Sequence, residues 1–189
     1  MAHIGMKYVV AAKLKEDETY DKGFVVAKAI QFTGTPSSND VQLYADDGVA
    51  ERDNSVVNMG TSLNVDDLSL KVQAELLGHT YTAAGTGQSA EPEKIVVSAD
   101  DVAPYVGMGF YKRRKKNGVT SYTAIWLYKV MNRAVTENAQ TKGQNTEFQT
   151  DTIEGTADQL TDGKIYEKVV FTSETAAKTW LNTKASITE

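Results

Sequence analysis

The chain has 189 residues, of which 41% are hydrophobic and 24% charged, and its formal net charge is -5. This length suits one well-buried domain, and the absence of cysteine excludes disulfide frameworks, thiol catalysis and cysteine-based metal sites. No apolar run approaches the length of a bilayer span, residues 1–7 lack the apolar segment of a signal peptide, and the acidic balance argues against a dedicated nucleic-acid-binding protein.

Short segments rich in β-branched and aromatic residues, separated by turn residues, predict a mostly β domain. In chain order the expected strands are 8–12, 23–32, 41–45, 62–65, 80–82, 94–97, 105–111, 119–130 and 164–171. Turn residues over 33–40 predict a break in the pattern. Asn117-Gly118 gives the strongest short hairpin signal in the chain. Residues 124–128 (AIWLY) are apolar at every position, which predicts a central strand buried on both faces.

One helix is clearly signalled over residues 66–77. Asp66 and Asp67 suit its cap and first turn, where free backbone N–H groups and the helix dipole favour carboxylates. Gly78 follows at the position where a left-handed C-terminal cap favours glycine. The helix also has one apolar stripe. Its members, which recur every fourth residue, are Leu68, Val72 and Leu76.

A second, shorter helix is predicted from about 174 to 182, with Ser173 as its cap. Its inward side chains are expected to be Ala176, Ala177, Trp180 and Leu181. Over 46–60 the polar sequence predicts a turn and then a long, partly extended loop. The chain has no repeat and no domain linker, so we predict a single α+β domain, mostly β, over 1–189, with 173–189 as a C-terminal helix and tail.

The sequence offers no constellation that fits catalysis, a metal or a cofactor. Only two histidines occur, His3 and His79, and His79 follows a helix end, where an imidazolium suits the helix dipole. The acidic pairs at 46–47, 66–67 and 100–101 fall at turns or helix starts, where capping explains them without a metal. Gly107-Met108-Gly109 lies inside a strand, so close backbone packing or a bulge is the expected reason for the glycines. We therefore expect that the protein is not an enzyme.

A run of basic residues, 112–116, precedes the Asn117-Gly118 turn. Three interpretations stay open: a solvated hairpin tip that also protects a strand edge, pairing with acidic loops of a neighbouring copy, and contacts with nucleic-acid phosphates. The last is disfavoured because the chain is acidic and no aromatic ladder flanks the run. The candidate contacts between copies are Asp46, Asp47, Glu51, Arg52, Lys112, Arg113 and Arg114.

Residues 143–157 (GQNTEFQTDTIEGTA) form a threonine-rich stretch whose alternate residues would lie on opposite faces of a strand. One face would carry Thr146, Phe148, Thr150 and Thr152, and the other Glu147, Gln149, Asp151 and Ile153. Neither face has enough apolar surface for an ordinary sheet core. Such a strand suits a place between water and a neighbouring subunit, as in a wide barrel built from several chains.

The order of these segments resembles the major tail protein, or tail tube protein, family of long-tailed siphophages of Gram-positive hosts. The resemblance covers nearly the whole chain and rests on order and spacing. Its parts are VVAKAIQFTGTP, NVDDLSLKVQAELLGH, APYVGMGFYKRRKKNGVTSYTAIWLYKV, QTKGQNTEFQTDTIEGTA and FTSETAAKTWL. Gln144 stands where glutamate is common in that family.

The resemblance implies a structural role without a cofactor. Such proteins form a β-sandwich or barrel with one outer helix, and they contribute strands to an inner β-barrel shared by several subunits. Their rings, typically hexameric, stack into the tail tube of the virion after synthesis in the host cytoplasm. The helix with Leu68 would cover the outside, and the 46–60 loop would reach an adjoining ring. The implied partners are further copies, the tape-measure protein, the tail terminator and the distal tail or initiator proteins, with no membrane.

Genomic DNA would pass through the lumen of such a tube without specific binding. Acids on the wall repel phosphate over a Debye length of about 10 Å. Glu147 and Asp151, on one strand face, are the candidate lumen residues. Two other interpretations stay open: a ring or tube protein of a related machine, such as a tailocin or an Hcp-like secretion tube, and a ligand-binding β-domain or small-ligand enzyme, which would need a convergent polar pocket.

Overall fold

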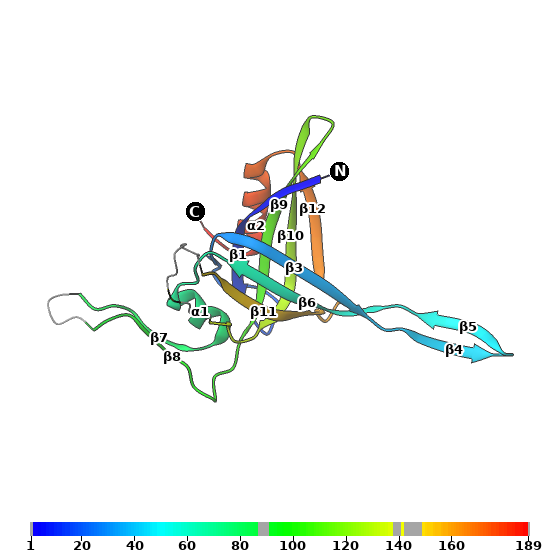
Figure 1. Ribbon diagram of the computed structural model, residues 1–189, viewed down its shortest axis with the longest axis horizontal. Coiled ribbons are helices and arrows are strands. Elements are labelled where there is room, and N and C mark those ends of the chain that lie inside the picture. The colour runs from blue at the N-terminus through cyan, green and yellow to red at the C-terminus, as the bar shows by residue number, and fades with distance from the viewer. Residues whose placement is uncertain (1, 87–90, 138–140, 142–148, 189) are drawn as a thin grey trace.

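The computed structural model describes residues 2–86, 91–137, 141 and 149–188. These residues form the strands and helices labelled in Figure 1, and the domain is mostly β, as the sequence predicts. The strands are β1 (Ala2–Lys13), β2 (Phe24–Val25), β3 (Ala29–Ser38), β4 (Val41–Ala45), β5 (Gly48–Asp53), β6 (Val56–Val65), β7 (Thr80–Thr82), β8 (Lys94–Val96), β9 (Tyr105–Lys116), β10 (Val119–Asn132), β11 (Asp151–Asp158) and β12 (Tyr166–Phe171). The helices are α1 (Leu70–Leu77) and α2 (Glu174–Lys184).

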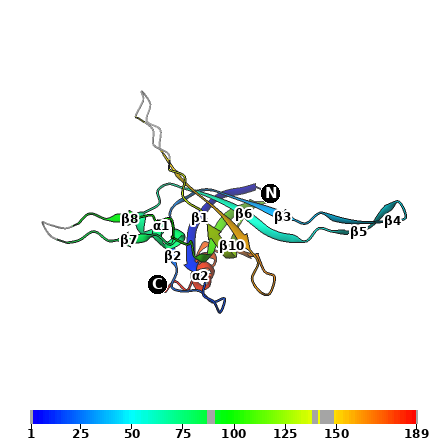
Figure 2. The ribbon, with the colours of Figure 1, turned by 90° about the horizontal axis from the view of Figure 1, so that it is seen from below.

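The main sheet is antiparallel, in the order β2-β1-β9-β10-β11-β6-β3, and β12 also pairs with β10. Along one edge, β10 pairs with β12 over Tyr122–Leu127 and then with β11 over Lys129–Asn132. The register between β9 and β10 shifts just there, between Leu127 and Val130. Such an irregularity bends a strand and increases its twist. Strands β11, β6 and β3 therefore form a second layer over β1, β9 and β10, with α2 on the opposite side (Figure 2).

Alternate residues of β10 pack in two separate apolar cores. Ile125 and Leu127 belong to the larger core, between the sheet layers, whereas Ala124 and Trp126 belong to the core beneath α2. All four are buried, which confirms the central strand predicted from AIWLY, and Tyr128 is half-buried. Each large side chain of this kind contributes about 1.5–3 kcal/mol when it leaves water. The strand thus connects the two cores.

Helix α1 begins later than the sequence predicts. Ser69 is its N-cap, and its hydroxyl accepts a hydrogen bond from the Val72 amide at 3.4 Å. Asp66, predicted as a cap, instead accepts from the backbone N–H of Lys28 at 3.1 Å, so this acid joins the helix approach to the segment after β2. The C-terminal prediction is confirmed, because Gly78 has φ 77° and its N–H donates to the Ala74 carbonyl at 2.9 Å.

Helix α2 begins after Ser173, as predicted, although the Ser173 side chain makes no capping hydrogen bond. Ala177 and Leu181 are fully buried and Trp180 is half-buried against Phe171. Ala176 was expected to face inward and is exposed. The helix runs to Lys184, two residues beyond the prediction, and Ala185 is also buried in the core beneath it. These contacts fix α2 on the outer face of β1, β9 and β10.

Three predicted segments differ in the structure. Residues 23–32 were expected to form one strand, but β2 pairs with β1 and β3 pairs with β6, so the chain crosses between layers over 26–28. Residues 33–40 were expected to break the pattern, yet β3 continues to Ser38 through Pro36, which an edge strand tolerates. The loop expected over 46–60 is instead the second half of a hairpin, β4–β5, followed by β6.

The two-residue hairpin between β9 and β10 is confirmed. Asn117 and Gly118 have φ values of 49° and 81°, the left-handed conformation that such a tight turn requires. Gly107 and Gly109 further down β9 face the Trp126 ring, so the expectation of close backbone packing is also confirmed. A Cβ at Gly109 would lie 2.5 Å from Trp126 Cε3 and 2.7 Å from Leu181 Cδ2.

Replacement of Gly109 by alanine should overpack the core beneath α2 and lower the free energy of unfolding by about 1–3 kcal/mol. Urea denaturation followed by tryptophan fluorescence measures this change. Gly60→Ala is the matched control, because its Cβ would meet nothing closer than the Thr35 carbonyl at 3.8 Å. Equal stability of the two variants would contradict this packing.

Candidate assembly surfaces

The outer face of the β3-β6-β11 layer is polar throughout. On the inner face Phe32, Leu63 and Ile153 are paired across the three strands and contribute to the larger core. The residues of alternate parity lie on the other face. They are Gln31, Thr33, Thr35 and Ser37 in β3, Asn58, Gly60, Ser62 and Asn64 in β6, and Thr152, Glu154, Thr156 and Asp158 in β11, and all are exposed or half-buried.

The ionisable side chains among the β3, β6 and β11 residues of this face, which we call the polar face, are Glu154 and Asp158. Glu154 is exposed and lies opposite Ser62, which in turn lies opposite Thr33. Asn64 donates from Nδ2 to the hydroxyls of Thr150 and Thr152, at 3.1 and 2.9 Å. Threonine and asparagine thus satisfy one another across strands, and the sheet presents hydroxyl and amide groups to solvent.

The predicted lumen residues need a correction of face. Glu147 lies outside the described residues. Asp151 shares the strand parity of buried Ile153, and its carboxylate accepts a hydrogen bond from the Leu68 backbone N–H at 2.8 Å. Asp151 therefore holds the approach to α1, and the acids of β11 on the opposite face are Glu154 and Asp158. The sequence pattern separates the two faces correctly but contains no signal for which one the core covers.

The apolar stripe predicted for the first helix lies in the larger core. Leu68 and Leu76 are 3% and 0% exposed, and Val72 is half-buried against the same core. Leu68 precedes the helix, since α1 begins at Leu70. The approach segment and α1 together cover one end of the space between the sheet layers.

The β4–β5 hairpin projects from the body as a narrow arm, reached through the ends of β3 and β6 (Figure 1). We call residues 39–57 the arm. It contains five acidic residues and one arginine, Arg52, whose Nε lies 3.8 Å from Asp40 Oδ1. Asp46 and Asp47 form its turn in the left-handed conformation, and Glu51 is exposed on β5. Its exposed large apolar residues are Val41, Leu43, Tyr44, Val49, Val56 and Val57.

The basic run at 112–116 divides between the two faces of β9. Lys112 has the same parity as Phe110 and points into a groove between the layers. Arg113 lies on the α2 side, in a small hollow that also contains Glu174. Arg114 donates from Nε to the Ser121 hydroxyl at 3.2 Å across the hairpin. The run therefore does not form one continuous basic patch.

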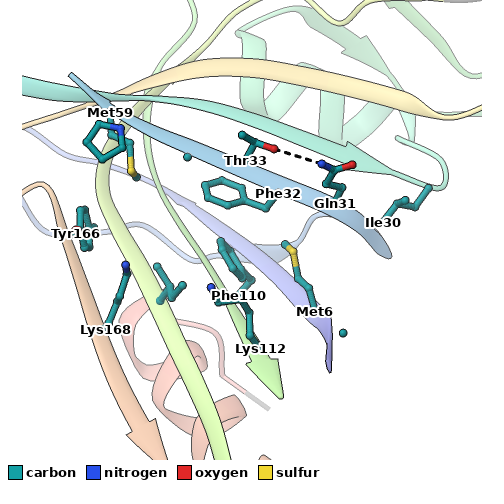
Figure 3. Close-up of a pocket in the computed structure, with 14 residues that line it drawn as sticks. Met6, Ile30, Gln31, Phe32, Thr33, Met59, Phe110, Lys112, Tyr166 and Lys168 are labelled. Carbon is teal, nitrogen blue, oxygen red and sulfur yellow. Dashed lines mark hydrogen bonds between the residues drawn. The ribbon is translucent and has the colours of Figure 1, made fainter. Parts of the chain in front are cut away.

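The groove that Lys112 enters has a volume of about 560 Å³ and lies between edge strand β3 and β12 (Figure 3). Its floor is apolar, with the rings of Phe32 and Phe110 at 4.6 Å between centroids and Met59 beside them. Lys112 and Lys168 add two ammonium groups. Burial and the charge of Lys168 lower the pKa of Lys112. Sequence reasoning did not find this groove, because its residues come from six separate strands.

His79 has a partner that the sequence did not reveal. Its Nδ1 lies 2.8 Å from Asp101 Oδ2, and the same carboxylate oxygen accepts from the Ser98 backbone N–H at 2.8 Å. Both hydrogen bonds lower the pKa of Asp101, and the hydrogen bond from the Ser98 backbone N–H has a larger effect than the one with His79. The pair joins the end of α1 to the segment after β8. Among the described residues, no group of three acids, histidines or cysteines is placed to hold a metal ion.

None of the described helices is long and apolar enough to span a membrane. No family model matches the chain, and no curated protein matches it either. The described residues present a polar sheet face, a protruding arm, a sheet edge at β3 and an apolar groove with two cations.

Substitution of Asp151 by alanine should destabilise the fold, because the Leu68 N–H would lose its charged acceptor at a half-buried position. A hydrogen bond to a charged group contributes about 1.5–3 kcal/mol, and a loss in that range is expected in urea denaturation. Glu154→Ala is the control, since the exposed Glu154 side chain should cost less than about 0.5 kcal/mol. Equal losses would contradict the different roles given to these acids.

Proposed function

We propose that the protein is a structural subunit that assembles with copies of itself into stacked rings, forming the tail tube of a bacteriophage. The observation that carries the proposal is the polar face of the β3-β6-β11 layer. Hydroxyl and amide side chains make up most of this face. Its acids are Glu154 and Asp158, and the exposed Arg133 lines a hollow on it together with Glu154. Such a wall suits a water-filled channel that a long polyanion must cross without adhering.

The sheet edge beside this face supports the same proposal. β3 ends the sheet order, so its outer edge has no partner strand among the residues that the structure describes. An unpaired edge is a template for a further strand, and proteins that stay monomeric normally protect it. A subunit that pairs this edge with a neighbouring copy extends the polar face around a ring, and closure of the ring removes the free edge.

The arm supplies a second means of association. Its exposed valines, Leu43 and Tyr44 have no cover within the described part of the chain. Several exposed apolar side chains on one projecting arm favour a contact with another molecule. In the proposed tube, the arm reaches an adjoining copy, while the tape-measure protein and genomic DNA occupy the lumen. The tail terminator and the initiator proteins bind the tube ends.

A tailocin tube or an Hcp-like secretion tube is the related alternative, since it requires the same surfaces. Neighbouring genes separate these possibilities: a tape-measure protein, portal and terminase favour the phage. The proposed place of the protein is the virion tail, after synthesis in the cytoplasm of the host.

The purified protein, concentrated and aged, is expected to form stacked rings or hollow tubes with a regular axial repeat. Negative-stain microscopy together with light scattering tests this. Since phage tubes often need a nucleus, the same measurement is made with tail-initiation proteins added. A monodisperse monomer under both conditions would overturn the proposal.

Glu154 is expected to line the lumen. Its replacement by lysine would place one cation per subunit against DNA phosphates, within a Debye length of about 10 Å. We expect genome ejection to slow several-fold while tubes of normal appearance form, and Glu154→Gln to have a smaller effect. Phages carrying each variant, assayed by DNA release, provide the measurement. Ejection at the unaltered rate in Glu154→Lys phages would contradict the lining role.

A further inference from the structure

The groove between β3 and β12 has the chemistry of a receptor for an acidic and apolar segment. A volume of about 560 Å³ lies within the usual range of ligand pockets, roughly 300–1,000 Å³, and it accommodates a few side chains. Its floor of Phe32, Phe110 and Met59 favours an aromatic or aliphatic group. Exposed Ile30 on one rim and Tyr166 on the other, at 53% and 39%, extend this apolar surface outward.

The two lysines define the charge of the occupant. Lys112 is half-buried, and no acid in the described part of the chain forms an ion pair with it or with Lys168. Lys168 instead places its Nζ 4.7 Å from the centre of the Tyr166 ring. Burial and the charge of Lys168 lower the pKa of Lys112, and a carboxylate beside the two cations would stabilise their charged forms. The groove therefore favours an anionic partner with an apolar side chain next to its charge.

The tip of the arm has this composition. Leu43 and Tyr44, 60% and 67% exposed, are separated from the turn acids Asp46 and Asp47 only by Ala45. The arm ends in the turn between β4 and β5, and this end is narrow enough to enter the groove between β3 and β12. No other described turn combines adjacent exposed apolar residues with two consecutive acids and a short hairpin, so charge and shape both select this one.

We propose that the groove between β3 and β12 receives the arm tip of a second copy of this chain, with Asp46 and Asp47 paired to Lys112 and Lys168 and Tyr44 against the partly exposed Phe32. The inference rests on the self-association in the proposed function and names the two surfaces that make one of its contacts. It also explains the basic run: only its first lysine serves the contact, because Arg113 and Arg114 have other surroundings.

The arm cannot fill the groove of its own subunit. β3 forms one wall of the groove near Pro36 and then continues outward into the arm. Ten residues separate Pro36 from Asp46, and at ~3.3 Å per residue the tip lies roughly 30 Å from that wall. Figure 1 shows the arm directed away from the body. The contact joins two different surfaces, so it is head-to-tail and generates rings or filaments instead of a closed dimer.

Cross-linking tests the contact directly, because the chain has no cysteine of its own. One protein carries Ala45→Cys in the arm tip and a second carries Ile30→Cys on the groove rim. The two are mixed at high concentration with a short bismaleimide. We expect a covalent heterodimer, formed at least about tenfold more than when Thr175→Cys, exposed on α2, replaces Ile30→Cys. Equal yields with the groove and control positions would overturn the inference.

Charge reversal provides the second test. Lys112→Glu with Lys168→Glu should reduce the cross-linked heterodimer at least about tenfold, since like charges would face each other. Asp46→Lys with Asp47→Lys in the arm protein should restore it. Circular dichroism verifies that each variant is folded. If the Lys112→Glu, Lys168→Glu variant unfolds, the single variant Lys168→Glu replaces it in the test, because Lys168 is exposed. Loss without restoration would overturn the pairing of these charges.

The outcomes separate this inference from the proposed function. Tubes that assemble without a groove-specific cross-link leave the tube proposal standing and refute the arm contact. A specific cross-link in a protein that never forms rings or tubes supports the arm contact and refutes the tube. A small amphipathic carboxylate that saturates the groove and leaves the cross-link yield unchanged would also overturn the inference.

Discussion

Strand β10 pairs with β9 on one side. On its other side, its partner strand changes from β12 to β11 within two residues. Every layer of the domain depends on this exchange. Before it, β10 lies in a sheet covered by α2 and by the larger core. After the change of partner, β10 pairs with β11, β11 with β6, and β6 with β3. These three strands cover the other side of the larger core. A single strand can serve two layers because its neighbours differ along its length, and the register shift beside Leu127 provides the bend.

The two sides of the domain differ in how their polar groups and strand edges are covered. Beneath α2, buried hydroxyls and acids satisfy one another: Tyr128 donates to Glu167 at 2.6 Å, Lys184 pairs with the same carboxylate at 2.8 Å, and Tyr8 donates to Asn182 at 2.7 Å. Burial raises the pKa of Tyr20 to about 12, so its hydroxyl stays neutral while it donates to the Tyr128 carbonyl. That side is complete in one chain. The β3-β6-β11 side has a polar outer face, an edge strand without a further partner among the described residues, and an arm with exposed apolar side chains.

Local chemistry made much of the fold predictable. Asn117-Gly118, Gly78 and the apolar run 124–128 each act within a few residues, and the structure confirms all three. Long-range pairing made the rest unpredictable. The sequence around Pro36 predicts a break in the strand, because it does not show that β3 is an edge strand. The sequence of the arm predicts a loop, because it does not show that β4 pairs with β5. The candidate site followed the same division: the sequence separated the two faces of residues 151–157 but could not assign Asp151 to the core side, and the groove depends on six strands that only folding brings together.

Pro36 in the middle of β3 has a consequence for the edge of the sheet. A proline supplies no N–H, so β3 does not carry an uninterrupted row of donors and acceptors. Cross-β stacking requires such a row from every chain at every level, and a proline within the segment opposes it. This strand is therefore a poorer template for amyloid than a strand of the same length without a proline.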